Sequence, residues 1–489
     1  MRWYSGIRRE DQRVADGDSL RLWLSVCFLE VEMERLFGRQ VIYTDVEEIN
    51  VANVLDVIGK TRDTFARNSA QIDFLYKYYR GDQPILCRKK DVRPEICNRI
   101  VENRANEIVA FKVGYLCGEP IQYISRSGDD NVARGIGSLN DMMLVESKAA
   151  KDRDLVEWQM IGGTAYRMVL VSDDDSSESP FELYTLDPRC AYVIYSSKIG
   201  NKPLAGVHVG TNSDGETIHT VYTKNEFFEL NGREVLQRKA HGLGWVPIIE
   251  YPANNARLGA FETVIPILDA INTVASNRID GVEQFVQSLM KFINCEIDKE
   301  TFANLQQMGA ISIKSQDGKV ADVEILTQEL NQQQTQTLVD YMYQTVLTIC
   351  GMPNRNGGGS STSDTGAASL LRDGWTLAEA RAKDSELMFK RSEREMLKIV
   401  LRICSLAANV NLKLADVETK FTRRNYENIQ TKAQVLCEML NNPKIDPKLA
   451  FSHCGMFTDA EEAYQMSIKW FKEQQKKQVN TEGGEPTDK

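Results

Sequence analysis

The spacing of apolar residues divides the 489-residue chain into helical and β-rich stretches. Helical spacing runs through residues 47–77 and again through 96–117, where it closes at Gly118. Between residues 155 and 253 the pattern changes to short runs rich in β-branched and aromatic residues, separated by Asp, Ser, Gly and Asn turns. This half of the chain predicts an α+β domain over roughly residues 41–255.

The second half of the chain predicts two helices on either side of a small insert. Residues 264–282 carry one apolar stripe, and residues 331–350 again have helical spacing. The polar residues opposite the first stripe are Asp269, Asn272, Ser276 and Asp280. Residues 285–328 between the helices have the pattern of a small α/β insert. Because the insert is short, we expect the two helices to form an antiparallel pair.

A Gly/Ser/Asn-rich segment over residues 352–365 follows the second helix. A loop of this length between two helices is usually functional or disordered. A long helix is predicted from about Gly366 to Ala408, with Gly374 as its weakest point. Helical segments fill residues 425–475, and a polar, disordered tail is expected after them.

Composition and charge narrow the function classes. Hydrophobic residues make up 42% of the chain and charged residues 26%, which is typical of an ordinary folded protein. The 59 basic and 69 acidic side chains give a net charge of −10. Non-specific binding to nucleic acid needs a basic surface. This charge balance therefore argues against a protein that binds DNA by neutralising its phosphates over a broad surface.

Motifs for catalysis, metals and cofactors are missing from the sequence. The ten cysteines include no CxxC pair, and the four histidines are scattered. The sequence contains no P-loop, no complete dinucleotide fingerprint and no nucleophile elbow. No window approaches the ~18 apolar residues needed to span a bilayer. We therefore expect no enzyme, no cofactor, no metal and no membrane partner.

The N-terminal residues 1–40 require a separate interpretation. Arginines precede the apolar run Leu20–Leu29, as in a signal peptide, but Arg21 interrupts the run and glutamates replace the small residues of a cleavage site. We expect either an appended amphipathic helix or a translation start assigned too far upstream, with Met33 as the alternative start.

Several segments, in this order, resemble tailed-bacteriophage portal proteins of the Bacillus siphophage type. The resemblance covers roughly residues 45–470 and rests on their ordered combination, since no single segment is diagnostic. The segments are YYRGDQPI (78–85), VENRANE (101–107), GEP (118–120), VPIIEY (246–251), LDAINTVASNR (268–278), TICGMPN (348–354) and SLL (369–371).

The resemblance implies a division of the chain into the parts of a portal subunit. The N-terminal extension of doubtful role, 1–40, is not required by the family pattern. The other parts would be a wing (41–258), a first stem helix (259–282), a clip (283–330), a second stem helix (331–352), a tunnel loop (353–365), a long helix joining wing and channel (366–409), a crown (410–471) and a disordered tail (472–489).

The resemblance also implies a function and a set of partners. Portal proteins form a homo-oligomeric ring, usually of about twelve subunits, at one capsid vertex. Double-stranded DNA passes through the ring during packaging and ejection. The expected partners are the terminase large subunit, a head–tail adaptor, and the major capsid and scaffold proteins. Such a protein assembles in the host cytoplasm and resides in the virion. The alternatives are a phage DNA-processing enzyme and a minor capsid or scaffold component.

Candidate site residues follow from these parts. The tunnel loop would face DNA with Asn354, Arg355, Asn356, Gly357, Gly358, Gly359, Ser360 and Ser361. The channel-lining candidates on the second stem helix are Gln333, Gln336, Asp340 and Gln344, and the clip candidates are Lys314 and Lys319. The stretch 331–352 has no positive charge, which suits DNA that must slide because each neutralised phosphate adds affinity.

We hypothesise that Arg355 and the amides of Asn354 and Asn356 make transient phosphate contacts. Replacing Arg355 with Glu is then expected to lower the yield of DNA-filled heads, because a carboxylate repels phosphate. Ring assembly, measured by electron microscopy, should be unchanged. An unaltered yield of filled heads would contradict the hypothesis.

Overall fold

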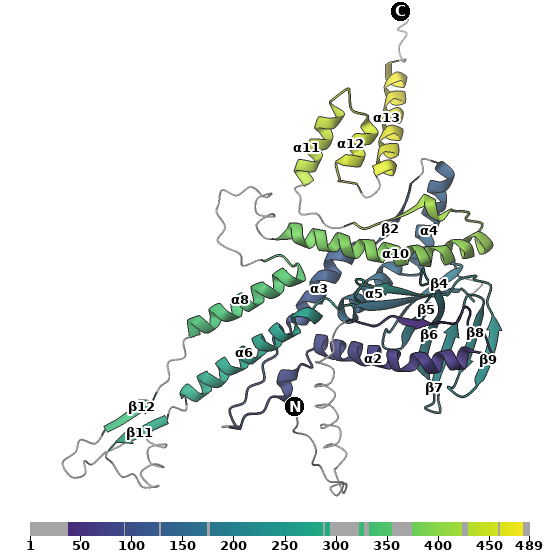
Figure 1. The fold of residues 1–489 in the computed structure, drawn as a ribbon. Helices are drawn as coiled ribbons and strands as arrows, with labels where there is room; N and C mark the ends of the chain where they lie inside the picture. The colour runs from purple at the N-terminus through teal and green to yellow at the C-terminus, as the bar shows by residue number, and fades with distance from the viewer. Residues whose placement is uncertain are drawn as a thin grey trace, which may run out of the picture. The chain divides into compact units, whose positions relative to one another are not determined.

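A computed structural model of the chain describes most of its residues, in two compact units. The described residues are 38–91, 93–126, 129–173, 177–286, 289–293, 322–326, 332–354, 374–422, 429–457 and 460–482. Among these, the larger unit comprises 38–80, 105–263 and 348–482, and the smaller unit comprises 81–104 and 264–347. Figure 1 shows the elements, and each unit is described by itself below.

A six-stranded sheet forms the main body of the larger unit. Its strands lie in the order β1-β5-β6-β7-β8-β9; β1 runs parallel to β5, and the other neighbours are antiparallel. The strands are β1 (Ile42–Thr44), β5 (Ala191–Ser196), β6 (Pro203–Thr211), β7 (Thr217–Tyr222), β8 (Glu226–Leu230) and β9 (Val235–Ala240). Short connections between consecutive strands produce a meander, as the turn residues between the β-rich runs predict.

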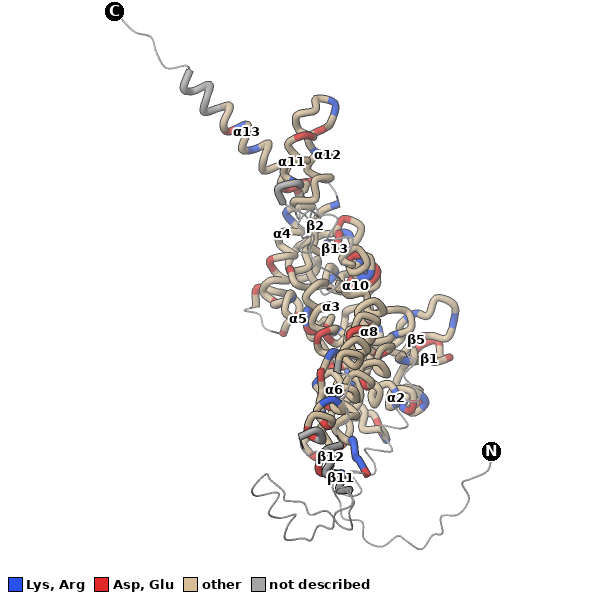
Figure 2. The backbone as a smooth tube through the Cα atoms, turned by 90° about the vertical axis from the view of Figure 1, so that its left-hand side faces the viewer, with Lys and Arg blue, Asp and Glu red and all other residues tan. Residues whose placement is uncertain are grey.

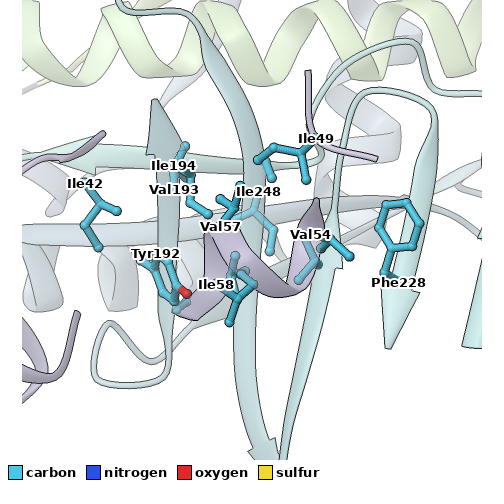
Figure 3. Close-up of a cluster of buried hydrophobic side chains, with 14 of the residues drawn as sticks. Ile42, Ile49, Val54, Val57, Ile58, Tyr192, Val193, Ile194, Phe228 and Ile248 are labelled. Carbon is cyan, nitrogen blue, oxygen red and sulfur yellow. The ribbon is translucent and has the colours of Figure 1, made fainter. Parts of the chain in front are cut away.

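The helix α2 (Val54–Arg80) supplies one side of the core of this sheet. Its Val54, Val57 and Ile58 lie at helical spacing and pack into the same cluster as Ile194 and Phe228 (Figure 3). Basic residues in the last turn of α2 interact favourably with the negative end of the helix dipole. The apolar residues at helical spacing in residues 47–77 therefore form the face of α2 that packs against the sheet.

A three-stranded antiparallel sheet lies in the same unit, in the order β10-β3-β4. Its strands are β10 (Ile248–Pro252), β3 (Thr164–Val171) and β4 (Phe181–Leu186). Ile248 of β10 packs closely over Gly206 of β6, where a Cβ atom would come within 2.4 Å of the Ile248 Cβ. A glycine at this position therefore permits the strands of the two sheets to approach closely.

Four further helices of the larger unit follow the sheets or precede them along the chain. They are α3 (Arg104–Cys117), α4 (Asp130–Val145), α5 (Lys148–Gly162) and the 33-residue α10 (Trp375–Ala407). A two-stranded sheet joins β2 (Gln122–Ser125) to β13 (Val417–Lys420), which follows α10 and the short η3 (Leu414–Asp416). The prediction of a mixed helix-and-sheet fold is confirmed.

A buried network of charges fixes α10 to the sheets. Glu393 of α10 is fully buried and lies 2.8 Å from Lys148 Nζ and 3.7 Å from Arg167 Nη1. Asp152 completes the network, 2.5 Å from Lys148 and 2.7 Å from Arg167. Tyr123 and Tyr251 also donate hydrogen bonds to Glu393, at 2.6 Å and 2.7 Å. Two cations balance two carboxylates, so each charge in this cluster has an opposite charge beside it, although the guanidinium nitrogens of Arg167 form no hydrogen bond within the described residues.

The C-terminal helices build a separate small core. Leu436, Ala450, Phe451 and Cys454 form it, from α11 (Ile429–Leu440), α12 (Pro447–His453) and the residue after α12. Asp446 caps α12 by accepting a hydrogen bond from the Lys448 amide. The last helix, α13 (Ala460–Glu482), continues eleven residues beyond 471. The prediction of a disordered tail is therefore wrong for residues 472–482, whose Gln- and Lys-rich sequence is compatible with a helix.

The smaller unit contains the two predicted helices, α6 (Ile265–Val286) and α8 (Gln332–Cys350). The last three residues of α8, after Leu347, belong to the larger unit. Between them, β11 (Leu289–Ile293) and β12 (Asp322–Leu326) form an antiparallel pair. Arg278 of α6 donates a 2.7 Å hydrogen bond to Gln336 of α8, which places the two helices side by side (Figure 1). The antiparallel pair expected from the short insert is thus present.

Residues 81–104 belong to the smaller unit, although the sequence placed them in the wing. They include the short η1 (Pro84–Cys87), and residues 97–103 have neither helical nor strand structure. The predicted helix over residues 96–117 is therefore wrong before Arg104, where α3 begins. Gly374 is also not a kink: it precedes α10 with a left-handed φ of 82°, a conformation that favours glycine.

The buried charge network generates a stability prediction. Replacing Arg167 with Met is expected to lower the free energy of unfolding by about 3–5 kcal/mol, because two buried carboxylates would share a single cation. Thermal unfolding followed by circular dichroism measures the effect. The matched control is Arg153→Met on α5, next to Asp152, where the side chain is exposed and the change should stay within about 0.5 kcal/mol. Equal effects of the two substitutions would contradict this account.

Candidate functional site

The polar face of α6 is buried against an extended strap, which we define as residues 96–103. Asn272, Ser276 and Asp280 are only 2%, 0% and 3% exposed. They accept hydrogen bonds from the backbone amides of Glu102, Ile100 and Asn98, at 2.9, 2.9 and 2.8 Å.

This ladder has a simple geometric cause. Four residues along a helix rise about 6 Å. Two residues along an extended chain advance about 6.6 Å. Polar side chains at every fourth helix position can therefore meet every second amide of an extended segment that runs antiparallel to the helix. The short side chains of Asn, Ser and Asp bring the strap close to the helix surface.

Asp280 holds the end of the ladder through ion pairs as well. Its Oδ2 lies 3.0 Å from Lys90 Nζ and 3.1 Å from Arg88 Nη2. Burial alone would raise the pKa of Asp280, but hydrogen bonds from Asn98 and Lys90 and the charge of Lys90 hold that pKa below its ordinary value. Asp280 is thus a buried, ionised carboxylate with its partners in place.

The four channel-lining candidates share one exposed face of α8. Gln333, Gln336, Asp340 and Gln344 are all exposed and follow one another at separations of three, four and four residues. Gln336 accepts from Arg278 and donates a 2.8 Å hydrogen bond to Asp340. The structure therefore brings these four residues together on a polar stripe whose one charge is negative.

Most of the other predicted site residues lie outside the described part of the chain. These are Arg355, Asn356, Gly357, Gly358, Gly359, Ser360 and Ser361 of the tunnel loop, and Lys314 and Lys319 of the clip. Residues 1–37 also lie outside it. Asn354 is described and is partly buried at the base of the loop.

Pro353, where the predicted tunnel loop begins, and Gly374, which precedes α10, are neighbours in the larger unit. A Cβ atom at Gly374 would lie 3.7 Å from the Pro353 Cα. Lys112 of α3 donates a 2.7 Å hydrogen bond to the carbonyl of Cys350, the last residue of α8. Burial lowers the pKa of Lys112, although the ammonium end contacts the negative end of a helix.

A second set of contacts on α3 holds the start of α10. Tyr115 donates a 3.0 Å hydrogen bond to Glu379, and the Trp375 ring lies 6.2 Å from that of Phe111. The helix α3 therefore contacts both the end of α8 and the start of α10. Sequence reasoning missed this role for α3 because nothing in its apolar spacing indicates which helix ends it contacts.

Neither the overall distribution of charged residues nor a cluster of metal ligands indicates a second site in the described part of the chain. Figure 2 shows acidic and basic residues interspersed along the described elements rather than gathered on one of them. In the part of the chain that the structure describes, no group of three or more His, Cys, Asp or Glu side chains is placed to hold a metal ion. Among the described helices, none combines the length and the apolar character needed to cross a membrane.

Comparison with known proteins identifies the class. The family model described as "Phage portal protein, SPP1 Gp6-like" matches residues 59–480, which is most of the chain. The chain therefore belongs to this phage portal protein family, and the resemblance noted in the sequence is confirmed. The family is structural rather than catalytic and places the chain in the phage capsid.

Other comparisons are more distant. One solved structure that matches is described as "Neck of empty GTA particle computed with C6 symmetry". The match has 11% sequence identity, covers 72% of this chain and 90% of that chain, and has a TM-score of 0.41. No curated protein matches the chain significantly.

The Asp280 ladder generates a prediction with a pH dependence. Replacing Asp280 with Asn should destabilise the protein by about 3 kcal/mol at pH 7, since Lys90 and Arg88 would lose their shared carboxylate. Because the folded-state pKa lies below the ordinary value of 3.8, the contribution of Asp280 is complete above about pH 4 and is lost as the pH falls through the folded-state pKa. Unfolding free energies of both proteins at several pH values measure this.

The matched control for this substitution lies on the same helix. Glu283→Gln removes an exposed carboxylate from α6 and should change stability by less than about 0.5 kcal/mol. The difference between wild type and the Asp280→Asn protein should shrink towards zero in acid. A difference that stays constant down to acid pH would show that the charge of Asp280 is not what stabilises the strap.

Proposed function

We propose that this chain forms a ring-shaped channel at one capsid vertex, through which double-stranded DNA is packaged and later ejected. The ring has about twelve copies. The clip, residues 283–330, docks the terminase large subunit and afterwards a head–tail adaptor. Major capsid and scaffold proteins contact the ring, which assembles in the host cytoplasm and remains in the virion. Membership of the portal family supports this proposal.

The observation that carries the channel function is the polar stripe on α8. DNA that moves through a pore must not be held tightly, and each phosphate paired with a Lys or Arg adds salt-dependent affinity. The stripe offers three glutamine amides and one aspartate, which form weak contacts with phosphate or repel it. The net charge of −10 per copy acts in the same direction.

The contacts of α3 support the same proposal. In this proposal the segment after Pro353 faces the DNA, and α3 contacts the end of α8 and the start of α10 on either side of that segment. Surface loops commonly carry function on a rigid scaffold. In this proposal the wing, long helix and crown are the parts that the family resemblance implies, except that residues 81–104 belong with the stem helices, the long helix includes α10 from Trp375, and the last helix of the crown continues to Glu482.

Electron microscopy of the purified full-length protein tests the central claim. Negatively stained particles should be rings with a central hole wide enough for a DNA duplex. Monomers, sheets or closed discs without a hole would contradict the proposal, and a metal-dependent nuclease activity would favour the DNA-processing alternative instead.

A charge change on the stripe tests how the channel handles DNA. The double variant Gln333→Lys/Gln344→Lys should assemble into rings but retain duplex DNA more tightly than wild type, with a steeper loss of affinity between 50 and 200 mM salt, about two units of log–log slope per subunit bound. Fluorescence anisotropy with a short labelled duplex measures this, and the yield of DNA-filled heads should fall.

The matched control changes the same two glutamines to negatively charged residues instead of positively charged ones. Gln333→Glu/Gln344→Glu should leave DNA retention and head filling near wild type, because the stripe already repels phosphate. If both double variants behave alike, the stripe does not face DNA.

A further inference from the structure

A small cavity of about 30 Å³ lies in the larger unit between α3, α10 and the residue after α8, and we name it the junction cavity. A water molecule needs about 10–15 Å³ of such space, so the cavity has room for two waters or for one halide ion. Its ten lining residues include two cations, Lys112 of α3 and Arg381 of α10, and no aspartate or glutamate. The charge that faces the cavity is therefore positive.

The two cations of the junction cavity repel each other. Burial lowers the pKa of Lys112, and the positive charge of Arg381 lowers it further. A Cβ atom at Gly351 would come within 2.7 Å of the Arg381 Cγ, so the arginine lies directly against the backbone that follows α8. The nearby Cys350 thiol does not balance these charges, because burial raises its pKa to about 11 and the thiol is neutral at pH 7.

The other polar groups of the junction cavity have partners. The Ser385 hydroxyl donates to the Arg381 carbonyl at 3.2 Å, and the Tyr115 hydroxyl donates at 3.0 Å to Glu379, which does not line the cavity. The last carbonyl of α8 accepts one hydrogen of the Lys112 ammonium at 2.7 Å. Within the described residues, neither Lys112 nor Arg381 forms an ion pair. An ammonium carries three hydrogens and a guanidinium five, so both groups can donate to an occupant of the cavity.

We propose that the junction cavity binds one small monovalent anion of halide size, which is chloride in ordinary salt solutions. The anion accepts charge-assisted hydrogen bonds from Lys112 and Arg381, and the repulsion between α3 and α10 becomes a bridge. Arg381 is exposed, so an ion from the solvent can reach the cavity. Because Lys112 also holds the end of α8, the bound anion connects three helices. The site lies within one copy of the chain and does not depend on ring formation.

An exchange of salts at constant ionic strength tests the site in the full-length protein. Chloride fits the cavity, whereas gluconate is too large to enter it. A ligand that binds only the folded state stabilises that state, so the unfolding midpoint of wild type should be about 2–4 °C higher in sodium chloride than in sodium gluconate. Thermal unfolding followed by circular dichroism measures the difference.

The variant Arg381→Gln separates anion binding from simple packing. In chloride it should be less stable than wild type, because one ligand of the anion is lost. In gluconate it should be at least as stable as wild type, because the repulsion of Lys112 is removed. Equal losses of stability in both salts would show that Arg381 acts through packing alone and would overturn the inference.

Two further variants serve as controls. Arg394→Gln removes an exposed α10 arginine that does not line the cavity and forms no ion pair among the described residues, and it should keep the chloride effect of wild type. Arg381→Lys preserves the positive charge and should keep part of that effect. Loss of the chloride effect in the folded Arg394→Gln protein would assign the effect to general charge screening and refute the site.

Chlorine NMR measures the binding directly, since a protein-bound chloride broadens the resonance of the free ion. Arg381→Gln should lower the chloride affinity by about tenfold or more, as expected when a hydrogen bond to a charged group is lost. Bromide should compete with chloride, whereas a short DNA duplex at the same ionic strength should not. Equal broadening by wild type and Arg381→Gln would contradict the inference, and displacement of chloride by the duplex would replace the halide with a DNA phosphate as the occupant.

Discussion

The position of α10 in the larger unit depends on one buried carboxylate. Glu393 is fully buried, and it joins α10 to α5 and β3 through Lys148 and Arg167 and to β2 and β10 through two tyrosines. Burial would raise the pKa of Glu393, and the two cations instead hold it below its ordinary value. The elements around Glu393 can be arranged in few ways, because any arrangement that removes one of its partners leaves a buried charge uncompensated. The helix is thereby fixed along its middle, and Tyr115 and Phe111 of α3 contact its start.

The same requirement, that buried polar groups find partners, organises the smaller unit. Every second backbone amide of the strap donates its hydrogen bond to Asn272, Ser276 or Asp280. These amides therefore cannot form the backbone hydrogen bonds of a helix. Apolar packing alone would allow α6 to rotate or slide. The ladder sets both its rotation and its register, and the ion pairs of Asp280 fix one end. In the proposed channel, α6 and α8 then offer a rigid support for the polar stripe.

Elements with a regular apolar period were predicted from the sequence with good positions. The helices α2, α6 and α8 and the strands β3 to β8 follow such periods because each buries apolar residues, whereas β9 and β10 were not predicted. The errors fall where a polar contact overrides the period. Residues 96–103 carry helical spacing but extend along α6, and Gly374 starts a helix that was expected to pass through it. Short polar residues at every fourth position of α6 were the available signal for the strap.

The sequence by itself indicated the class of this protein: an acidic chain whose ordered segments resemble portal proteins. It could do so because net charge and the order of short segments are properties of the chain alone. Tertiary structure decided which distant residues meet. The end of α8 and the start of α10 both contact α3, through Lys112 and Tyr115, and four buried charges from three elements neutralise one another. These juxtapositions join residues far apart in the chain, and no local period records them.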